Sequence, residues 1–327
     1  MDGYFPVETS RRRTLKTAIG CVGTGLHSGR RVSLTLHPAP AGSGIRFRRT
    51  DIGFEVAARY DNVVETRLCT ALGEPGGDRS RSIATVEHVM AALAGCGVDD
   101  ALVEIDGPEA PILDGSAAPI VFLLDCAGLS SQSGADTAQA IEVLRPVRVQ
   151  DGEGPDAAWA ELAPTPRSGF EASLTIDFPA TAIGRQSLTL RLSPRSFRGA
   201  LAEARTFTLA EEVAALRAAG LARGGSLANA VVVDGPLVLN PGGLRSPDEF
   251  VRHKLLDVVG DLALAGAPLR ARFSGHRSGH GLNNRLLRAL FADTANWRFA
   301  TPGVPVAAEG AAAASARLPA AAAPNTV

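Results

Sequence analysis

The stretch FVRHKLLDVVGDLALAG (250–266) decides the fold, because TVEHVMAALAG (85–95) repeats its plan earlier in the chain. Both stretches carry apolar residues at helical spacing, and both end on the same four residues, Ala-Leu-Ala-Gly. Each predicted helix has a histidine near its start and is followed by a strand, a turn and a further helix. This shared order predicts a duplicated α+β unit. Two such units facing each other would leave a cleft, where ligand sites tend to lie.

Around this repeat, the chain divides into two predicted domains joined by a polar linker. The linker, LSSQSGADTAQA (129–140), is small, polar and aperiodic, and it separates residues 13–128 from residues 141–305. Residues 1–12 are predicted to be a flexible leader, and the alanine-rich residues 306–327 a disordered tail. Alternating apolar and polar residues predict strands in both domains, at 30–40, 44–50, 141–150, 158–164, 170–178 and 187–193.

Composition excludes several classes of protein. The 327 residues carry a net charge of −1, which gives no electrostatic footprint for binding nucleic acid. No apolar run reaches the roughly 18 residues of a membrane span, although peripheral association with a membrane stays open. The first residues lack the apolar core of a signal peptide, and the four cysteines form no C-x-x-C pair. We therefore expect a cytoplasmic protein, and nothing in the sequence demands a partner chain, so a monomer is expected.

Potential metal ligands lie on one face of the second long helix. His253 and Asp257 are four residues apart, and Asp261 follows one turn further along the same face. An imidazole and a carboxylate one turn apart can bind one cation. A surface ion pair on an ordinary amphipathic helix explains the same spacing, and the spacing alone leaves both interpretations open.

Two further histidines have neighbours that suit catalysis. Glu87 and His88 are adjacent, so their side chains diverge by about 100° and can serve one site only in different roles. His280 lies between two glycines after a predicted strand, where a tight turn would present its ring in a cleft. Catalytic zinc has three nitrogen or oxygen ligands, with an acid or base beside it. The residues alone thus suggest a metal hydrolase, but a solvated turn histidine explains His280 equally well.

Seven segments together resemble the family of UDP-3-O-acyl-N-acetylglucosamine deacetylases. These zinc-dependent enzymes catalyse the committed step of lipid A synthesis in Gram-negative bacteria. The segments follow the order of the family and span roughly residues 13–292. They are GTGLHSG (23–29), RLCT (67–70), TVEHVMAALAGCGVDD (85–100), PILDGSAAPIVFLL (111–124), EARTF (203–207), FVRHKLLDVVGDLALAG (250–266) and SGHGLNN (278–284).

The resemblance implies a complete metal centre. The zinc ligands of the family fall on His88, His253 and Asp257. Its general base falls on Glu87, and its general acid or oxyanion-stabilising histidine falls on His280, with Asp261 as the partner of that ring.

The resemblance also implies how the substrate is held. Thr206 matches the threonine that hydrogen-bonds the tetrahedral oxyanion, and Phe207 beside it matches a residue on the sugar-nucleotide side. Lys254 matches a lysine that meets polar groups of the substrate. Leu68 and Cys69 match a segment that lines the entry to the acyl passage.

The implied fold class is α+β, with two related domains that each contain a β-sheet and a pair of helices. The helix layers pack together between the sheets, and each domain carries one small insert. The insert at about 208–240 would form an apolar tunnel for the acyl chain, although its stripe of Leu209, Val213, Leu216 and Leu221 also suits an ordinary core. Residues 150–162 contain no lysine or arginine, whereas the family has a diphosphate-contacting lysine there.

Three hypotheses follow from the sequence. The first is the deacetylase, acting on an acylated UDP-sugar with Zn²⁺, although Fe²⁺ also accepts histidine and aspartate ligands. The second is a metal-dependent amidohydrolase of another sugar nucleotide on the same fold. The third is a non-catalytic binding module built on the duplicated unit.

Overall fold

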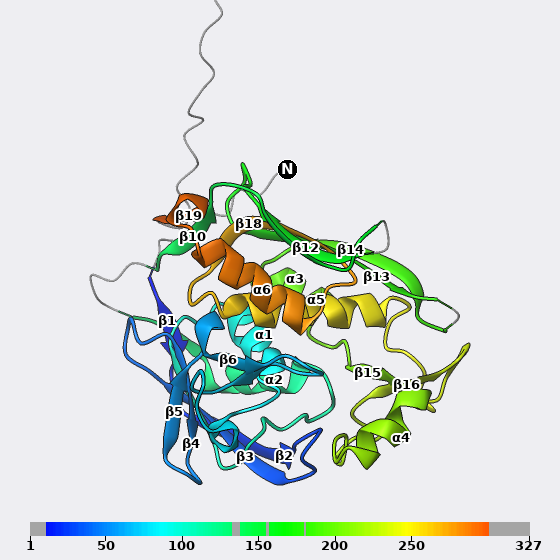
Figure 1. Ribbon diagram of the computed structural model, residues 1–327. Helices are drawn as coiled ribbons and strands as arrows, with labels where there is room; N and C mark the ends of the chain where they lie inside the picture. The colour runs from blue at the N-terminus through cyan, green and yellow to red at the C-terminus, as the bar shows by residue number, and fades with distance from the viewer. Residues whose placement is uncertain (1–10, 133–137, 155–156, 180, 301–327) are drawn as a thin grey trace, which may run out of the picture.

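The computed structural model describes residues 11–132, 138–154, 157–179 and 181–300. Residues 1–10 of the predicted leader, 133–137 of the predicted linker and the whole predicted tail lie outside the described residues. The remaining part of the chain forms two large sheets with helices between them (Figure 1).

The first large sheet has five strands in the order β2-β3-β8-β4-β5. Its strands are β2 (Ile19–Thr24), β3 (Arg31–Pro38), β4 (Ile45–Arg49), β5 (Phe54–Ala57) and β8 (Ala101–Ile105). Strand β3 shows why the alternating pattern predicts a half-buried strand: Val32, Leu34 and Leu36 are buried, while the residues between them are not. One face of this sheet therefore packs on the core.

The second large sheet has seven strands, of which β18 is the central one. Its strands are β10 (Ala140–Val143), β11 (Val147–Asp151), β12 (Ala158–Ala163), β13 (Phe170–Phe178), β14 (Gly184–Arg191), β18 (Leu269–His276) and β19 (Trp297–Ala300).

The pairing around β18 repeats the pairing around β8. Strand β8 is antiparallel to β3 and parallel to β4. Strand β18 is antiparallel to β12 and parallel to β13, and the outer strands β11 and β14 then pair as β2 and β5 do. The segment β11-β12-β18-β13-β14 therefore has the strand order of the first sheet.

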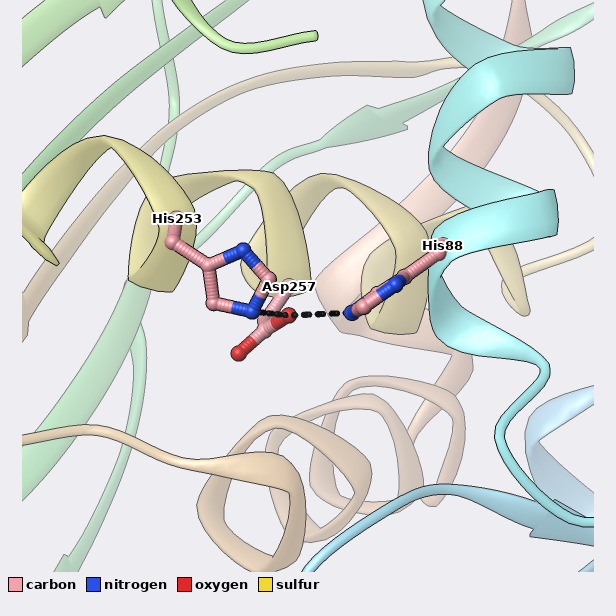
Figure 2. Close-up of side chains that lie close together, drawn as sticks. All are labelled: His88, His253 and Asp257. Atoms are coloured by element: carbon pink, nitrogen blue, oxygen red, sulfur yellow. Dashed lines mark ion pairs between the residues drawn. The ribbon is translucent and has the colours of Figure 1, made fainter. Parts of the chain in front are cut away.

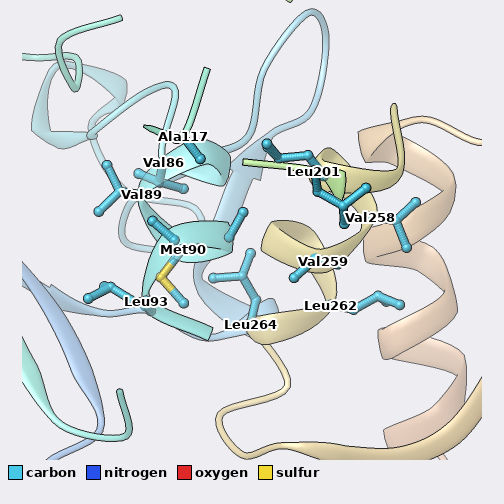
Figure 3. Packing of buried hydrophobic residues seen from close by; sticks show 14 of the residues in the cluster. Val86, Val89, Met90, Leu93, Ala117, Leu201, Val258, Val259, Leu262 and Leu264 are labelled. Atoms are coloured by element: carbon cyan, nitrogen blue, oxygen red, sulfur yellow. The ribbon is translucent and has the colours of Figure 1, made fainter. Parts of the chain in front are cut away.

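Four helices fill the space between the sheets. They are α1 (Glu87–Cys96), α2 (Ala118–Ala127), α5 (Glu249–Ala263) and α6 (His280–Phe291). In Figure 1, α1 and α2 lie on the five-stranded sheet, α5 and α6 lie on the seven-stranded sheet, and α1 packs against α5. Figure 3 shows buried residues around that contact, among them Met90 and Leu93 of α1 and Val259 and Leu262 of α5, which belong to one apolar cluster. Within the described residues, no helix has the length and apolar character needed to span a membrane.

Besides the pair of β1 (Arg13–Leu15) and β9 (Leu129–Ser131), the described residues form two more small sheets outside these layers. Strands β6 (Val63–Glu65) and β7 (Ala71–Leu72) form a hairpin in the first half. In the second half, β15 (Phe207–Leu209), β16 (Val231–Asp234) and β17 (Leu237–Val238) form a sheet with α4 (Ala210–Ala218) beside it. The second of these small sheets begins at Phe207 and falls in the stretch, about 208–240, for which the sequence predicts an insert.

Several predicted elements have different bounds in the structure. The predicted strand at 141–150 is two strands, β10 and β11, because Pro146 between them supplies no N–H for a ladder. Residues 129–131 of the predicted linker form β9 (Leu129–Ser131), which pairs with β1 (Arg13–Leu15). The short helix α3 (Pro194–Ala200) was not predicted, although Ser193 and Pro194 form a typical helix start.

Gly260 lets α1 and α5 cross in close contact. A Cβ atom at this position would lie 2.0 Å from the backbone oxygen of Glu87, well inside van der Waals contact. Gly260→Ala is therefore expected to destabilise the protein by about 2–4 kcal/mol, since neither helix backbone can move away cheaply. Urea unfolding measures the effect. Gly199→Ala is the matched control, because Gly199 is also helical and no atom of the described residues beyond its own surroundings lies within 4 Å of the added methyl group. Equal stability of the two variants would contradict this account of the crossing.

Candidate active site

His88, His253 and Asp257 form a buried cluster where α1 meets α5. His88 is the second residue of α1, and His253 and Asp257 lie one turn apart on α5 (Figure 2). Asp257 Oδ1 lies 3.4 Å from His253 Nε2 and 3.7 Å from His88 Nε2. His88, His253 and Asp257 are only 7%, 2% and 3% exposed. The alternative of a surface ion pair on α5 is therefore wrong.

The donor set of this cluster fits a divalent metal. The potential ligand atoms lie within 4.8 Å of one another, and ligands of a tetrahedral zinc with bonds of about 2.0–2.1 Å lie about 3.3 Å apart. Among the described residues, Asp257 Oδ1 has no hydrogen-bond partner although it is buried, which is costly unless another group binds it. His253 Nδ1 lies 3.0 Å from the carbonyl oxygen of Ala204, to which it must donate. That bond leaves the lone pair of Nε2 for a metal.

Glu87 lies next to the cluster at the first position of α1 and is 3% exposed. Burial, supported by the nearby carboxylates of Asp261 and Asp257, raises the pKa of Glu87 to about 7 although His280 opposes the shift. A carboxyl group with a pKa near neutrality is suited to take up and release a proton. A cation bound to the neighbouring cluster would favour the charged carboxylate and so lower this pKa.

His280 and Asp261 form a hydrogen-bonded pair close to the cluster. His280 Nδ1 donates to Asp261 Oδ2 over 2.9 Å, and its Nε2 lies 4.0 Å from Asp257 Oδ2 of the cluster. Burial disfavours the charged ring, but the combined attraction of Asp261, Glu87 and Asp257 outweighs it and raises the pKa of His280 to about 9. The expected turn position is wrong: His280 begins α6, and the chain turns before it at Arg277, whose φ is 52°.

Lys254 lies beside the cluster and contacts one of its members. The Nζ atom donates to Asp257 Oδ2 over 2.8 Å. Burial favours the neutral acid, but Lys254 and the surrounding histidines outweigh it and lower the pKa of Asp257 below its ordinary value. Lys254 thus keeps Asp257 ionised, a role that the sequence did not predict.

A cavity of about 220 Å³ brings the predicted residues together. Of the residues predicted from the sequence, those that line it are Leu68, Cys69, Glu87, His88, Thr206, Phe207, His253, Lys254, Asp257 and His280. Asp261 does not line the cavity but accepts a hydrogen bond from Nδ1 of His280, which does. Burial raises the pKa of Cys69 to about 12, so this residue is a neutral thiol and not a nucleophile.

Thr206 and Phe207 reach the cavity from the start of the second insert. The backbone of Thr206 bonds to Gly115 O and to Val231 N, both over 2.8 Å, which joins it to both halves of the protein. Phe207 packs edge-on against Phe178 and Phe250, with ring centroids 5.6 and 5.0 Å away. These contacts form an apolar wall on the insert side of the cavity.

Several residues near the cavity were not predicted. Phe178 lines the cavity at the end of an ordinary alternating strand, so the sequence carried no signal for it. His27, from the quoted segment GTGLHSG, also lines it, and in the described part of the chain neither of its buried ring nitrogens has a hydrogen-bond partner. Thr70 and Asn283 donate to Asp261 over 2.6 and 2.8 Å. Both belong to segments quoted above, RLCT and SGHGLNN, which offered a signal that the individual residue types did not.

Two imidazoles and a carboxylate beside a buried acid and a histidine–aspartate pair are the parts of a metal-dependent hydrolase. Residues 12–292 match the family model described as UDP-3-O-acyl N-acetylglycosamine deacetylase. The chain belongs to this family.

Curated relatives in several bacteria bear the same family name. The UDP-3-O-acyl-N-acetylglucosamine deacetylase of Acidithiobacillus ferrooxidans is 48% identical over 293 residues, which cover 88% of this chain and 92% of the relative. The enzymes so named in Anaeromyxobacter dehalogenans and Shewanella frigidimarina are 47% and 45% identical, again over 88% of this chain and over 89% and 91% of the relatives. The similarity thus extends over nearly the whole described part of the chain.

Proposed function

We propose that this protein hydrolyses the N-acetyl group of UDP-3-O-acyl-N-acetylglucosamine, a step of lipid A biosynthesis. Water adds to the amide carbonyl, the C–N bond breaks, and acetate and the free amine leave. The proposal rests on family membership together with one structural observation. That observation is the buried cluster of His88, His253 and Asp257 in the same cavity as Glu87 and His280.

His88, His253 and Asp257 would hold the metal, for which we propose zinc, with ferrous iron as the alternative. When bound, such a cation supplies positive charge that polarises the amide carbonyl and eases deprotonation of water. Two contacts of the chain favour metal binding. Lys254 keeps Asp257 ionised, and the bond from His253 Nδ1–H to Ala204 O leaves Nε2 available as a ligand.

Glu87 is proposed as the base and His280 as the acid. The Glu87 carboxylate takes the proton of the attacking water, and its burial, which raises its pKa, makes it a better base for this transfer. His280, charged because of Asp261, donates from Nε2 to the leaving nitrogen. Lys254 and the Thr206 hydroxyl would stabilise the negative charge that develops on the carbonyl oxygen.

The insert side of the cavity is proposed to receive the acyl chain and the sugar nucleotide. Leu209 and the edge-packed rings of Phe178 and Phe207 offer the apolar surface that an acyl chain requires. Val213 and Leu216 on α4 are only half-buried, which suits a surface that another apolar group covers better than it suits a core. Leu68, 44% exposed, would lie at the entry to this passage.

The repeated strand order supports two related domains, with boundaries at 13–128 and 141–305 and the insert at about 208–240. We propose this division for the chain, with each sheet and its helix pair forming one domain. A monomeric enzyme located in the cytoplasm stays a prediction from the sequence.

An acetate-release assay tests the proposed function. The purified protein is expected to release acetate from UDP-3-O-acyl-N-acetylglucosamine, and to release it at least about 100-fold more slowly from the analogue without the acyl chain, because binding energy from that chain contributes to the reaction. Turnover of another N-acetylated sugar nucleotide, with none on the acylated substrate, would indicate the alternative amidohydrolase. A purified protein with no metal and no turnover would indicate a binding module.

A further inference from the structure

We infer that Thr70 is a positioning residue, which holds the proposed base and the proposed acid in fixed relation to each other. This inference rests on the proposed function of Glu87 and His280. Thr70 is 2% exposed and lies just before β7, in the first half of the protein. It does not line the cavity, so it would act only through the residues that it contacts.

Thr70 donates two hydrogen bonds to two different carboxylates. Its backbone N–H bonds to Glu87 Oε2 over 3.0 Å, and its hydroxyl lies 2.6 Å from Asp261 Oδ1. An ionised carboxylate only accepts, so the hydroxyl proton of Thr70 must point to Asp261. One buried residue therefore links the start of α1 to the far part of α5.

The hydroxyl bond determines which oxygen of Asp261 serves His280. With Oδ1 occupied by Thr70, Oδ2 accepts from His280 Nδ1 over 2.9 Å and from Asn283 Nδ2 over 2.8 Å. Three donors on two oxygens prevent rotation of the carboxylate. The His280 ring is then held in the tautomer and orientation that direct Nε2 toward the cavity.

The second hydrogen bond, from the backbone N–H of Thr70, holds the side chain of Glu87. Because Oε2 accepts from Thr70, the carboxylate of Glu87 keeps a defined orientation toward the cavity. The close crossing at Gly260 brings Glu87 and Asp261 together, and Thr70 bridges them. Thr70 therefore positions both the proposed base, Glu87, and the partner of the proposed acid, Asp261.

The variant Thr70→Val tests the hydrogen bond from the Thr70 hydroxyl to Asp261. Valine has nearly the shape of threonine and keeps the backbone N–H, but it leaves Asp261 Oδ1 without its donor. We expect kcat for acetate release to fall by about 10- to 100-fold, the usual effect of removing an outer partner of a catalytic histidine, with little change in KM. Thr70→Ser keeps the hydroxyl and is expected to restore kcat to within about threefold of the wild type.

The double variant Thr70→Val/His280→Ala separates positioning from a general structural effect. If Thr70 acts through His280, the double variant should be no more than about twofold slower than His280→Ala alone. Thr14→Val is the matched control. Thr14 is also buried, and its hydroxyl accepts a hydrogen bond from Ala39 N over 3.0 Å, but it lies in β1 away from the cavity. It is expected to keep the kcat of the wild type.

A crystal structure of Thr70→Val gives a readout that does not depend on turnover. We expect His280 Nδ1 to move beyond hydrogen-bond distance of Asp261, or the Asp261 carboxylate to rotate. If the wild type releases no acetate, the proposed function fails, and this structure still decides the positioning role. Retention of the 2.9 Å contact, or a wild-type kcat in Thr70→Val, or a full additive loss in the double variant, would overturn the inference.

Discussion

His253→Ala is expected to abolish metal binding and, with it, acetate release. The variant removes one of three potential ligands and leaves Asp257 Oδ1 with fewer polar neighbours in a buried site. Changing even an outer partner of a ligand typically lowers metal affinity by 10- to 100-fold, so loss of a ligand should cost more than about 100-fold. Isothermal titration of the metal-free protein with Zn²⁺ measures this change directly.

The control for His253→Ala is another histidine beside a carboxylate. His37 in β3 is half-buried and lies 2.9 Å from Glu104, and its replacement by alanine should change neither metal content nor turnover. A His253→Ala protein that still binds zinc as tightly as the wild type would mean that the cluster is not the metal site.

Glu87→Gln is expected to keep the metal and lose most of the turnover. Glutamine has the shape of glutamate and keeps an oxygen that can accept from Thr70 N, but it cannot take a proton from water. Loss of a general base costs about 100- to 10,000-fold in kcat. Metal analysis together with steady-state kinetics separates this outcome from that of His253→Ala, because only His253→Ala should lose the metal.

A second glutamate provides the control for this variant. Glu74 is exposed and lies away from the cavity, so Glu74→Gln should keep the kcat of the wild type. If Glu87→Gln retained a rate close to that of the wild type, the proton would have to go elsewhere, and the assignment of Glu87 as the base would be wrong.

The sequence predicted those parts of the fold that depend on local pattern. The repeated Ala-Leu-Ala-Gly ends of two helices indicated a duplication, and strands β8 and β18 indeed have matching neighbours. The spacing of His253 and Asp257 placed them on one face of a helix, which the structure confirms. Periodicity could not tell that this face is buried, because burial depends on α1, which lies far away in the sequence.

The parts that could not be predicted depend on contacts between distant residues. Thr70 and Asp261 are 191 positions apart, and no spacing rule links a buried threonine to a carboxylate at that distance. Lys254 was predicted only as a substrate contact, and its bond to Asp257 is a local i, i+3 contact on α5 that the sequence analysis did not consider. His280 was misplaced in a turn because the glycines around it concealed the start of α6.

The central claim is that one divalent cation at His88, His253 and Asp257 is required for amide hydrolysis. The most direct test is to prepare the metal-free protein with a chelator and to measure acetate release while Zn²⁺ is added back stepwise. We predict that the rate is negligible without metal, rises in proportion to added Zn²⁺ and reaches its plateau at about one ion per chain. Full activity in the metal-free protein would contradict the account.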